Sequence, residues 1–302
     1  MPEFNAHFAP DLPDELAKVA TENARVRQVA SGFQFIEGPV WVDGRLLFSD
    51  IPQAKIFSWS PRDGLGVYRQ QSNSTNGNTL DREGRLISCE HNTRLVSATA
   101  PAIGGERTML VERFDHEGQK LRFNSPNDVV VHPATGAIYF TDPYWGLPGN
   151  RREELMEYGP DQCWVFRCDG DGSNCRPVVK DFKRPNGLAF SPDAKQLYIG
   201  DDQERHVRRF DVGDDGELGG GDVFCEIDQG VPDGMRVDAD GRLFSTAGDG
   251  VHVFLPNGRR VGKILCKETP ANCCFGGEEG RTLFMTAHNG LYAIDLLTRG
   301  AA

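Results

Sequence analysis

The chain contains 302 residues and carries a formal net charge of −11 at pH 7. An acidic surface repels the phosphates of nucleic acids, so we expect no nucleic-acid partner. No apolar stretch reaches the ~18 residues of a membrane-spanning helix, so we expect no membrane span. The first residues also lack the basic and apolar segments of a secretory signal, and we therefore predict a cytoplasmic location.

The expected elements near the N-terminus are a helix and a strand. The sequence DLPDELAKVA, residues 11–20, predicts a short helix within an N-terminal extension that covers residues 1–23. A strand is expected next in ARVRQVA, residues 24–30. The 35 Gly and 18 Pro are spread along the chain, which favours many short strands joined by tight turns.

A sequence phrase recurs six times along the rest of the chain. Each copy has an apolar strand, a turn and a second apolar strand, as in VDGRLLFSD around Gly44 and ADGRLFSTA around Gly241. Four strands can be assigned per copy, but only three remain in the last copy before the chain ends. We therefore predict an all-β fold, a six-bladed β-propeller formed by residues 1–302 as one domain. An open last blade would expose a strand edge, so residues 24–30 are expected to close it.

One polar residue precedes the first strand of every copy. Because the first strand of a propeller blade lines the central channel, these six side chains should meet at one mouth of the channel. They are Glu37, Asn76, Asn127, Asn186, Asp233 and Asn272. Asn-Gly and Asp-Gly are also common turn dipeptides, which is the alternative interpretation. Glu37, followed by Gly-Pro, has no such turn explanation.

This set of donors predicts a cation site. Carboxylate and amide oxygens are hard ligands that suit Ca²⁺, with Mg²⁺, Mn²⁺ or Zn²⁺ as alternatives. Two carboxylates among neutral amides would neutralise a divalent ion without a large excess of negative charge. The candidate metal ligands are Glu37, Asn127, Asn186 and Asp233. The eight cysteines lack zinc-knuckle spacing and are expected to be buried free thiols.

Other candidate substrate contacts lie after second strands. His91 ends the second strand of the second copy and should lie near the channel mouth, although a plain structural role is the alternative. Residues 141–160 form the longest insertion, a candidate lid whose Tyr144 and Trp145 could stack on a sugar ring. A packed surface loop is the alternative there. The chain lacks the Gly-x-Ser-x-Gly, Gly-x-Gly-x-x-Gly, Walker and His-Glu-x-x-His motifs.

Five phrases occur in order over about residues 32–297: EGPVW, SPNDVVVHP, YFTDPYWG, RPNGLAFSPD and PDGMRVDADG. Together they resemble the gluconolactonase group of the senescence-marker-protein (regucalcin) superfamily. The resemblance implies a six-bladed propeller that hydrolyses lactones and holds a divalent cation, commonly Ca²⁺, in its channel. It assigns metal ligation to Glu37, Asn186 and Asp233. It gives Asn127 either ligation or substrate contact, and it places Asn76 at the corresponding position of blade two.

The expected activity is hydrolysis of a sugar lactone, with the cation polarising the carbonyl and a carboxylate activating water. Asp233 is the first candidate base and Glu37 the second, while attack by a water acidified by the metal is the alternative. Competing functions are a phosphotriesterase or aryl-esterase, a non-catalytic calcium-binding or protein-binding propeller, and a propeller like strictosidine synthase. The expected partner is a small-molecule lactone, and the sequence predicts no oligomeric state.

Overall fold

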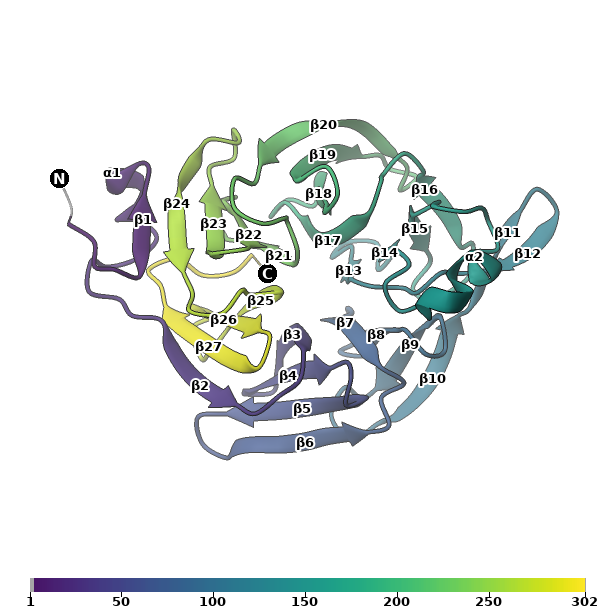
Figure 1. Cartoon of the computed structure of the whole chain (residues 1–302), viewed down its shortest axis with the longest axis horizontal. Coiled ribbons are helices and arrows are strands. Elements are labelled where there is room, and N and C mark those ends of the chain that lie inside the picture. Colours follow the sequence, from purple (N-terminus) through teal and green to yellow (C-terminus); the bar gives the residue numbers. More distant parts are fainter. Residues whose placement is uncertain (1–2, 302) are drawn as a thin grey trace.

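Six antiparallel sheets surround a central channel in the computed structural model, which describes residues 3–301 (Figure 1). The six-bladed β-propeller predicted from the repeat is therefore confirmed. In each blade the first strand of the sequence copy lies innermost and the later strands follow outward. This arrangement brings residues that are far apart in the sequence to one central axis.

Blades one to three follow in chain order. Blade one contains β3 (Ile36–Val42), β4 (Arg45–Asp50), β5 (Lys55–Ser60) and β6 (Gly64–Gln70). Blade two contains β7 (Thr75–Leu80), β8 (Leu86–Glu90), β9 (Leu95–Ala100) and β10 (Glu106–Val111). Blade three contains β13 (Val129–Val131), β14 (Ile138–Asp142), β15 (Trp164–Cys168) and β16 (Arg176–Val179).

Blades four to six complete the ring. Blade four contains β17 (Pro185–Phe190), β18 (Gln196–Asp201), β19 (His206–Val212) and β20 (Leu218–Glu226). Blade five contains β21 (Met235–Val237), β22 (Leu243–Ala247), β23 (Gly250–Phe254) and β24 (Arg260–Leu265). Blade six contains β25 (Asn272–Gly276), β26 (Thr282–Ala287) and β27 (Gly290–Asp295) from the C-terminal part of the chain.

The N-terminal segment contributes strands to two blades. The strand β2 (Arg27–Ser31) pairs antiparallel with β27 and is the outer strand of blade six, beginning three residues later than the expected 24–30. The strand β1 (Phe8–Pro10) adds a fifth strand to blade five through β24, which the sequence did not predict. The helix α1 spans only Pro13–Leu16, shorter than the expected 11–20, and its Leu16 is buried between blades five and six.

Apolar side chains fill the junctions between neighbouring blades. Each of the six junctions has its own cluster of buried residues, because the two faces of every sheet pack against adjacent sheets. At the junction that closes the ring, Trp41 of blade one stacks on Phe284 of blade six with ring centroids 5.4 Å apart. Burial of apolar area at these junctions, at roughly 25 cal/mol per Å², holds the blades in place around the channel.

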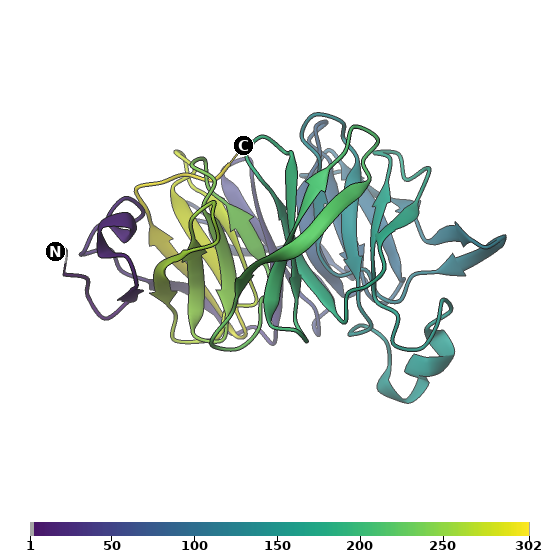
Figure 2. The same ribbon diagram turned by 90° about the horizontal axis from the view of Figure 1, so that it is seen from above.

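Two insertions project from blades two and three. The hairpin β11 (Arg113–His116) and β12 (Gln119–Arg122) pairs only with itself, beyond the outer edge of the ring (Figure 2). The insertion between β14 and β15 contains a 3₁₀ turn, η1 (Gly149–Arg151), and the helix α2 (Arg152–Leu155). It projects from one face of the ring (Figure 2) and has a small apolar cluster of its own.

All eight cysteines are free thiols, and six of them are buried. Five of the six buried cysteines pack as small apolar groups in the junctions between blades, and Cys163 packs in the cluster of the insertion; buried free thiols are what the sequence predicts. A cytoplasmic location stays a prediction. None of the helices within residues 3–301 has the length and apolar composition that crossing a bilayer requires.

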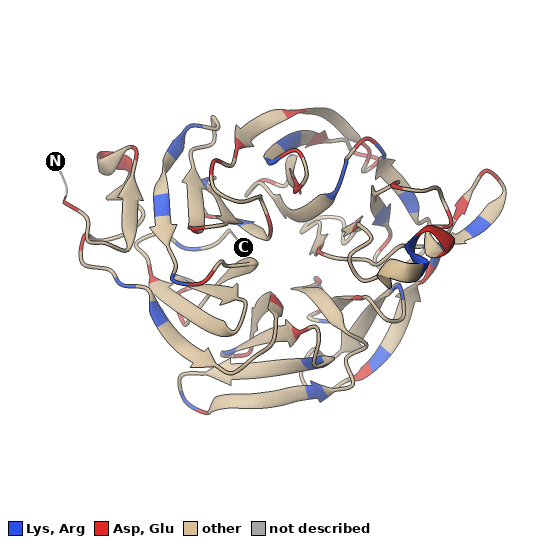
Figure 3. Ribbon diagram, in the orientation of Figure 1, with Lys and Arg blue, Asp and Glu red and all other residues tan. Residues whose placement is uncertain are grey.

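A network of charges connects the loop after β20 to β24, whose ribbon is blue at its basic residues in Figure 3. Asp228 accepts from Lys263 Nζ at 2.8 Å and pairs with Arg260 at 2.7 Å. Burial by itself would raise the pKa of Asp228, but these two cations outweigh it and hold the pKa well below its usual range.

We expect Asp228→Asn to lower the free energy of unfolding by about 0.5–1 kcal/mol at pH 7. The effect is limited because the carboxylate is 48% exposed and solvent screens the pair. An aspartate with a depressed folded-state pKa stabilises the fold above about pH 4, and this contribution is lost as the pH falls toward the folded pKa. Urea unfolding at pH 7 and at pH 3 measures the difference. An equal loss of unfolding free energy at both pH values would contradict the explanation by ion pairing.

Candidate active site

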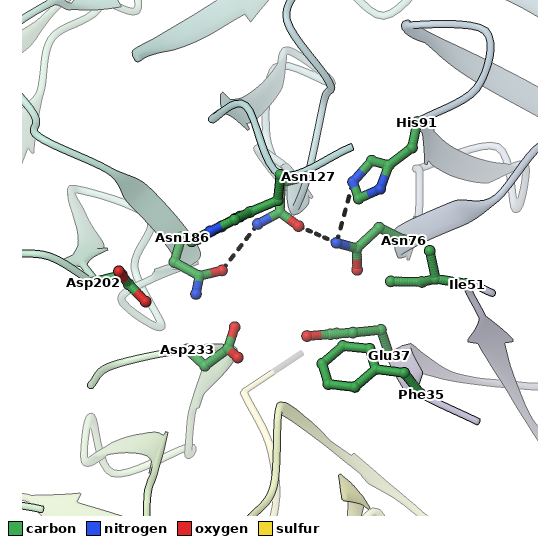
Figure 4. Close-up of a pocket in the computed structure, with 10 residues that line it drawn as sticks. Phe35, Glu37, Ile51, Asn76, His91, Asn127, Asn186, Asp202 and Asp233 are labelled. Carbon is green, nitrogen blue, oxygen red and sulfur yellow. Dashed lines mark hydrogen bonds between the residues drawn. The ribbon is translucent and has the colours of Figure 1, made fainter. Parts of the chain in front are cut away.

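A pocket of about 360 Å³ opens at one mouth of the channel (Figure 4). Its walls come from five blades, which supply the polar positions of the sequence phrase, and from loops that follow second strands. The lining residues are Phe35, Glu37, Ile51, Asn76, His91, Asn127, Trp145, Asn186, Asp202 and Asp233. All four predicted metal ligands therefore line one pocket.

A β-bulge accompanies the polar position in three blades. The pairing register shifts between Glu37 and Val40 in β3, between Thr75 and Asn78 in β7, and between Pro185 and Leu188 in β17. A bulge inserts an extra residue, bends the strand and turns a side chain away from the regular alternation. We attribute the shared inward direction of Glu37, Asn76 and Asn186 to this local backbone geometry.

The glycine that follows the polar residue is required by close packing of neighbouring blades. A Cβ added to Gly38 would lie 2.1 Å from the carbonyl oxygen of Asn76, and one added to Gly187 would lie 2.2 Å from that of Asp233. These distances are far below van der Waals contact. The glycines after Glu37 and Asn186 thus allow the inner strands to approach each other, which the turn interpretation does not explain.

Two carboxylates face each other across the pocket (Figure 4). Glu37 is 4% exposed, and its Oε2 accepts from the Gly38 amide at 2.6 Å. Burial raises the pKa of Glu37, and the negative charge of Asp128 raises it further. Burial also raises the pKa of Asp233, and Glu37 adds to that shift. A positive charge between the two groups would offset both their desolvation and their mutual repulsion.

Three amides form a chain beside the carboxylates. Asn76 Nδ2 donates to Asn127 Oδ1, and Asn127 Nδ2 donates to Asn186 Oδ1 at 3.0 Å. Each amide oxygen has two lone pairs, so Asn186 Oδ1 retains one for another partner. The hydrogen bonds fix which end of each amide faces the pocket.

The donor set suits a hard divalent cation. It combines two carboxylates with amide oxygens and leaves space for water, as Ca²⁺ sites do. Among residues 3–301, the structure has no group of three or more His, Cys, Asp or Glu that could hold a metal ion. A cation in this pocket would therefore depend on the amide oxygens of Asn127 and Asn186 as well as on Glu37 and Asp233.

His91 lines the pocket where the sequence placed it, directly after β8. Its Nε2 lies 3.4 Å from Asn76 Nδ2. Burial lowers the pKa of His91 to about 4, so the imidazole is neutral near pH 7. The backbone of the insertion covers the ring, since a Cβ on Gly146 would lie 2.5 Å from His91 Cγ.

The two aromatic residues of the insertion have different positions. Trp145 lines the pocket and is 38% exposed, which leaves its ring available to a ligand. Tyr144 instead lines a neighbouring cavity, because Arg152 lies over its ring at 4.3 Å and its hydroxyl accepts from Arg184. This corrects the expectation that both rings face the same ligand.

The sixth polar position also differs from the expectation. Asn272 does not line the pocket; its Oδ1 accepts from the Cys273 amide at 2.8 Å, and its side chain is hydrogen bonded to Glu37 and Asp128. A Cβ added to Gly234 would lie 2.0 Å from Asn272 Cγ, so the Asn272 side chain packs directly against the neighbouring blade. Asn272 therefore supports Glu37 through a hydrogen bond and is not itself part of the pocket wall.

Sequence reasoning missed three pocket residues, Phe35, Ile51 and Asp202. A usable signal was present for two of them. The second strands of blades one, two and four end in an acidic residue, and the residue that follows it is Ile51, His91 or Asp202. His91 was found in this position, and the same reasoning applied to the other blades would have identified Ile51 and Asp202.

The fold and the site together define a six-bladed propeller with an acidic, oxygen-rich pocket at one mouth of its channel. The family model described as "SMP-30/Gluconolactonase/LRE-like region" matches residues 35–289. The chain belongs to this family.

Named relatives agree with that assignment. The chain is 31% identical to a gluconolactonase of Zymomonas mobilis, over 97% of this chain and 86% of that protein. It is 26% identical to pentonolactonase XacC of Haloferax volcanii, over 87% and 85% respectively. A solved structure of a gluconolactonase from Xanthomonas campestris superposes with a TM-score of 0.84 at 32% identity, covering 96% of this chain and 94% of that chain.

Proposed function

We propose that this protein hydrolyses a sugar lactone with the help of a divalent cation held by Glu37, Asn127, Asn186 and Asp233. The chain is a lactone-hydrolysing enzyme of the gluconolactonase type, and its relatives include a gluconolactonase and a pentonolactonase. The observation that carries the metal-dependent proposal is the convergence of two carboxylates and several amides on one pocket. We favour Ca²⁺, with Mg²⁺, Mn²⁺ or Zn²⁺ as alternatives.

The reaction adds one water across the acyl–oxygen bond. The water oxygen bonds to the carbonyl carbon, the ring C–O bond breaks, the ring oxygen leaves as a hydroxyl, and the new acid releases a proton. When bound, a divalent cation would polarise the carbonyl and stabilise the developing oxyanion as a Lewis acid. Binding the lactone beside these donors orders it for attack.

The chain's own groups move the protons and orient the substrate. We propose that Asp233 takes a proton from the attacking water with one carboxylate oxygen, and that Glu37 is the second candidate base. Asn76 and Asn127 present amide groups that can bind the lactone, and the neutral His91 can accept or donate a hydrogen bond. The exposed ring of Trp145 provides a flat surface for the C–H face of a sugar.

Two other functions use the same pocket differently. The electrophile could be an aryl ester or a phosphotriester, or the site could bind calcium without catalysis. The pocket has the size of a small-molecule site, and we favour a lactone because the named relatives include a gluconolactonase and a pentonolactonase. We therefore expect a small-molecule lactone as the partner.

The test is the release of acid from D-glucono-δ-lactone, recorded above spontaneous hydrolysis with and without EDTA. We expect chelation to abolish the acceleration and added Ca²⁺ to restore it. In parallel, Ca²⁺ should raise the melting temperature of the wild-type protein, because a ligand that binds only the folded state stabilises it. Activity that survives complete chelation would overturn the metal-dependent proposal. Absence of any acceleration in metal-loaded protein, with aryl esters or phosphotriesters turned over instead, would favour the alternatives.

A further inference from the structure

The pocket contains a third carboxylate, Asp202, that the proposed metal site does not use. It lies on the side of Asn186 and Asp233, across the pocket from His91 and Ile51 (Figure 4). Glu37 and Asp233 already balance the charge of a divalent cation. Asp202 therefore needs a different role, or a different partner for its negative charge.

Arg184 is that partner. Its Nε donates to Asp202 Oδ1 at 2.6 Å, and its Nη2 contacts the same oxygen. The two residues are joined through the backbone as well, because the Asp202 amide donates to the Arg184 carbonyl at 3.0 Å. Both contacts of the Arg184 guanidinium are with Oδ1 of Asp202, so Oδ2 remains available to a ligand in the pocket.

The arginine is itself held by the insertion. Its guanidinium carbon lies 5.6 Å from the centre of the Trp145 ring, and its Nη1 donates to the Tyr144 hydroxyl at 3.3 Å. This arrangement places a fixed, charge-assisted acceptor next to an exposed aromatic surface. An acceptor beside an aromatic face suits a sugar ring, which presents hydroxyl groups at its edge and C–H groups on its face.

We infer that Asp202 is a specificity-determining residue that accepts a hydrogen bond from a hydroxyl of the lactone, at the part of the ring remote from the carbonyl. Arg184 is its positioning residue. The site therefore selects neutral, polyhydroxylated lactones over lactones without hydroxyls and over lactones that carry an anionic group. This inference rests on the proposed lactonase function and adds the class of substrate.

The test compares three lactones in the wild type, in Asp202→Asn and in Asp202→Ala: D-glucono-δ-lactone, δ-valerolactone, which has no hydroxyl, and 6-phospho-D-glucono-δ-lactone. Loss of the charge-assisted hydrogen bond should lower kcat/KM for gluconolactone by about 10- to 100-fold in both variants. For δ-valerolactone we expect a change within about twofold, since it makes no such bond. Where δ-valerolactone reacts too slowly, its inhibition constant replaces kcat/KM.

The phosphorylated lactone should respond in the opposite direction. Removal of the Asp202 charge also leaves the Arg184 charge uncompensated, so kcat/KM for the phosphorylated lactone should itself rise, and its ratio to that of the unmodified lactone should rise by more than about 10-fold. Damage to the fold cannot raise activity on one substrate while lowering it on another. Ca²⁺ should still bind in calorimetry, because Asp202 is not a proposed ligand, and only a modest loss of affinity is expected from removal of its nearby negative charge.

Asp181→Asn is the matched control. It removes an aspartate paired with Arg208 in the same blade, whose carboxylate is 68% exposed, and it should leave all three rates unchanged. Equal losses for the three lactones, or an unchanged rate for gluconolactone, would overturn the role of Asp202. A wild-type protein that hydrolyses none of the lactones would instead overturn the proposed function, and the inference with it.

Discussion

Asp233→Asn should lower kcat for lactone hydrolysis by about 10²- to 10⁴-fold, the range associated with loss of a general base. The substitution keeps the size of the side chain and its hydrogen bond to the Asn186 amide. It removes the carboxylate that is proposed to take the proton from water. Acid release from D-glucono-δ-lactone measures the effect, and Asp181→Asn again serves as the control.

Calcium binding separates the two roles proposed for Asp233. A variant that still binds Ca²⁺ in calorimetry but has lost turnover identifies Asp233 as the base. A variant that has lost both identifies it as an essential ligand, and the assignment of the base then passes to Glu37, tested by Glu37→Gln. Full turnover in Asp233→Asn would contradict both roles.

Gly38→Ala should lower the free energy of unfolding by about 3 kcal/mol or more, because it combines overpacking with an unfavourable backbone conformation. The new Cβ would lie 2.1 Å from the Asn76 carbonyl oxygen, and Gly38 has a φ of +54°. The inner strands of blades one and two would have to separate at the point where Glu37 and Asn76 enter the pocket. We therefore expect lactonase activity to fall together with stability.

Gly84→Ala is the matched control for this substitution. Gly84 has a φ of +71°, but no atom lies within 4 Å of a Cβ added there. Gly84→Ala should lower the free energy of unfolding by only about 1 kcal/mol, because the unfavourable backbone conformation is its only cost. Urea unfolding of both variants measures the difference. Equal losses would show that the close approach of the blades does not explain the glycine.

The repeating parts of the fold could be predicted because each blade encodes them locally. Alternating apolar residues, a turn and one polar residue recur in every copy, and the turn contains glycine in five of the six. The number of blades and the ring of polar side chains therefore follow from the sequence. The features that were missed occur once. Neither β1 on blade five nor the hairpin β11–β12 has a counterpart elsewhere in the chain, and a strand of three residues gives little signal.

The sequence by itself determined the six-bladed ring and the identity of the donors that face its channel. Only the tertiary structure decided which of those donors share the pocket. Asn272 occupies one of the six polar positions, as Asn186 does, yet its side chain packs against Gly234 of the neighbouring blade and does not line the pocket. Tyr144 and Trp145 are adjacent in the sequence, but contacts with Arg152 and Arg184 direct them to different cavities. The physical reason is that such choices depend on contacts between blades, and those contacts join residues far apart in the chain.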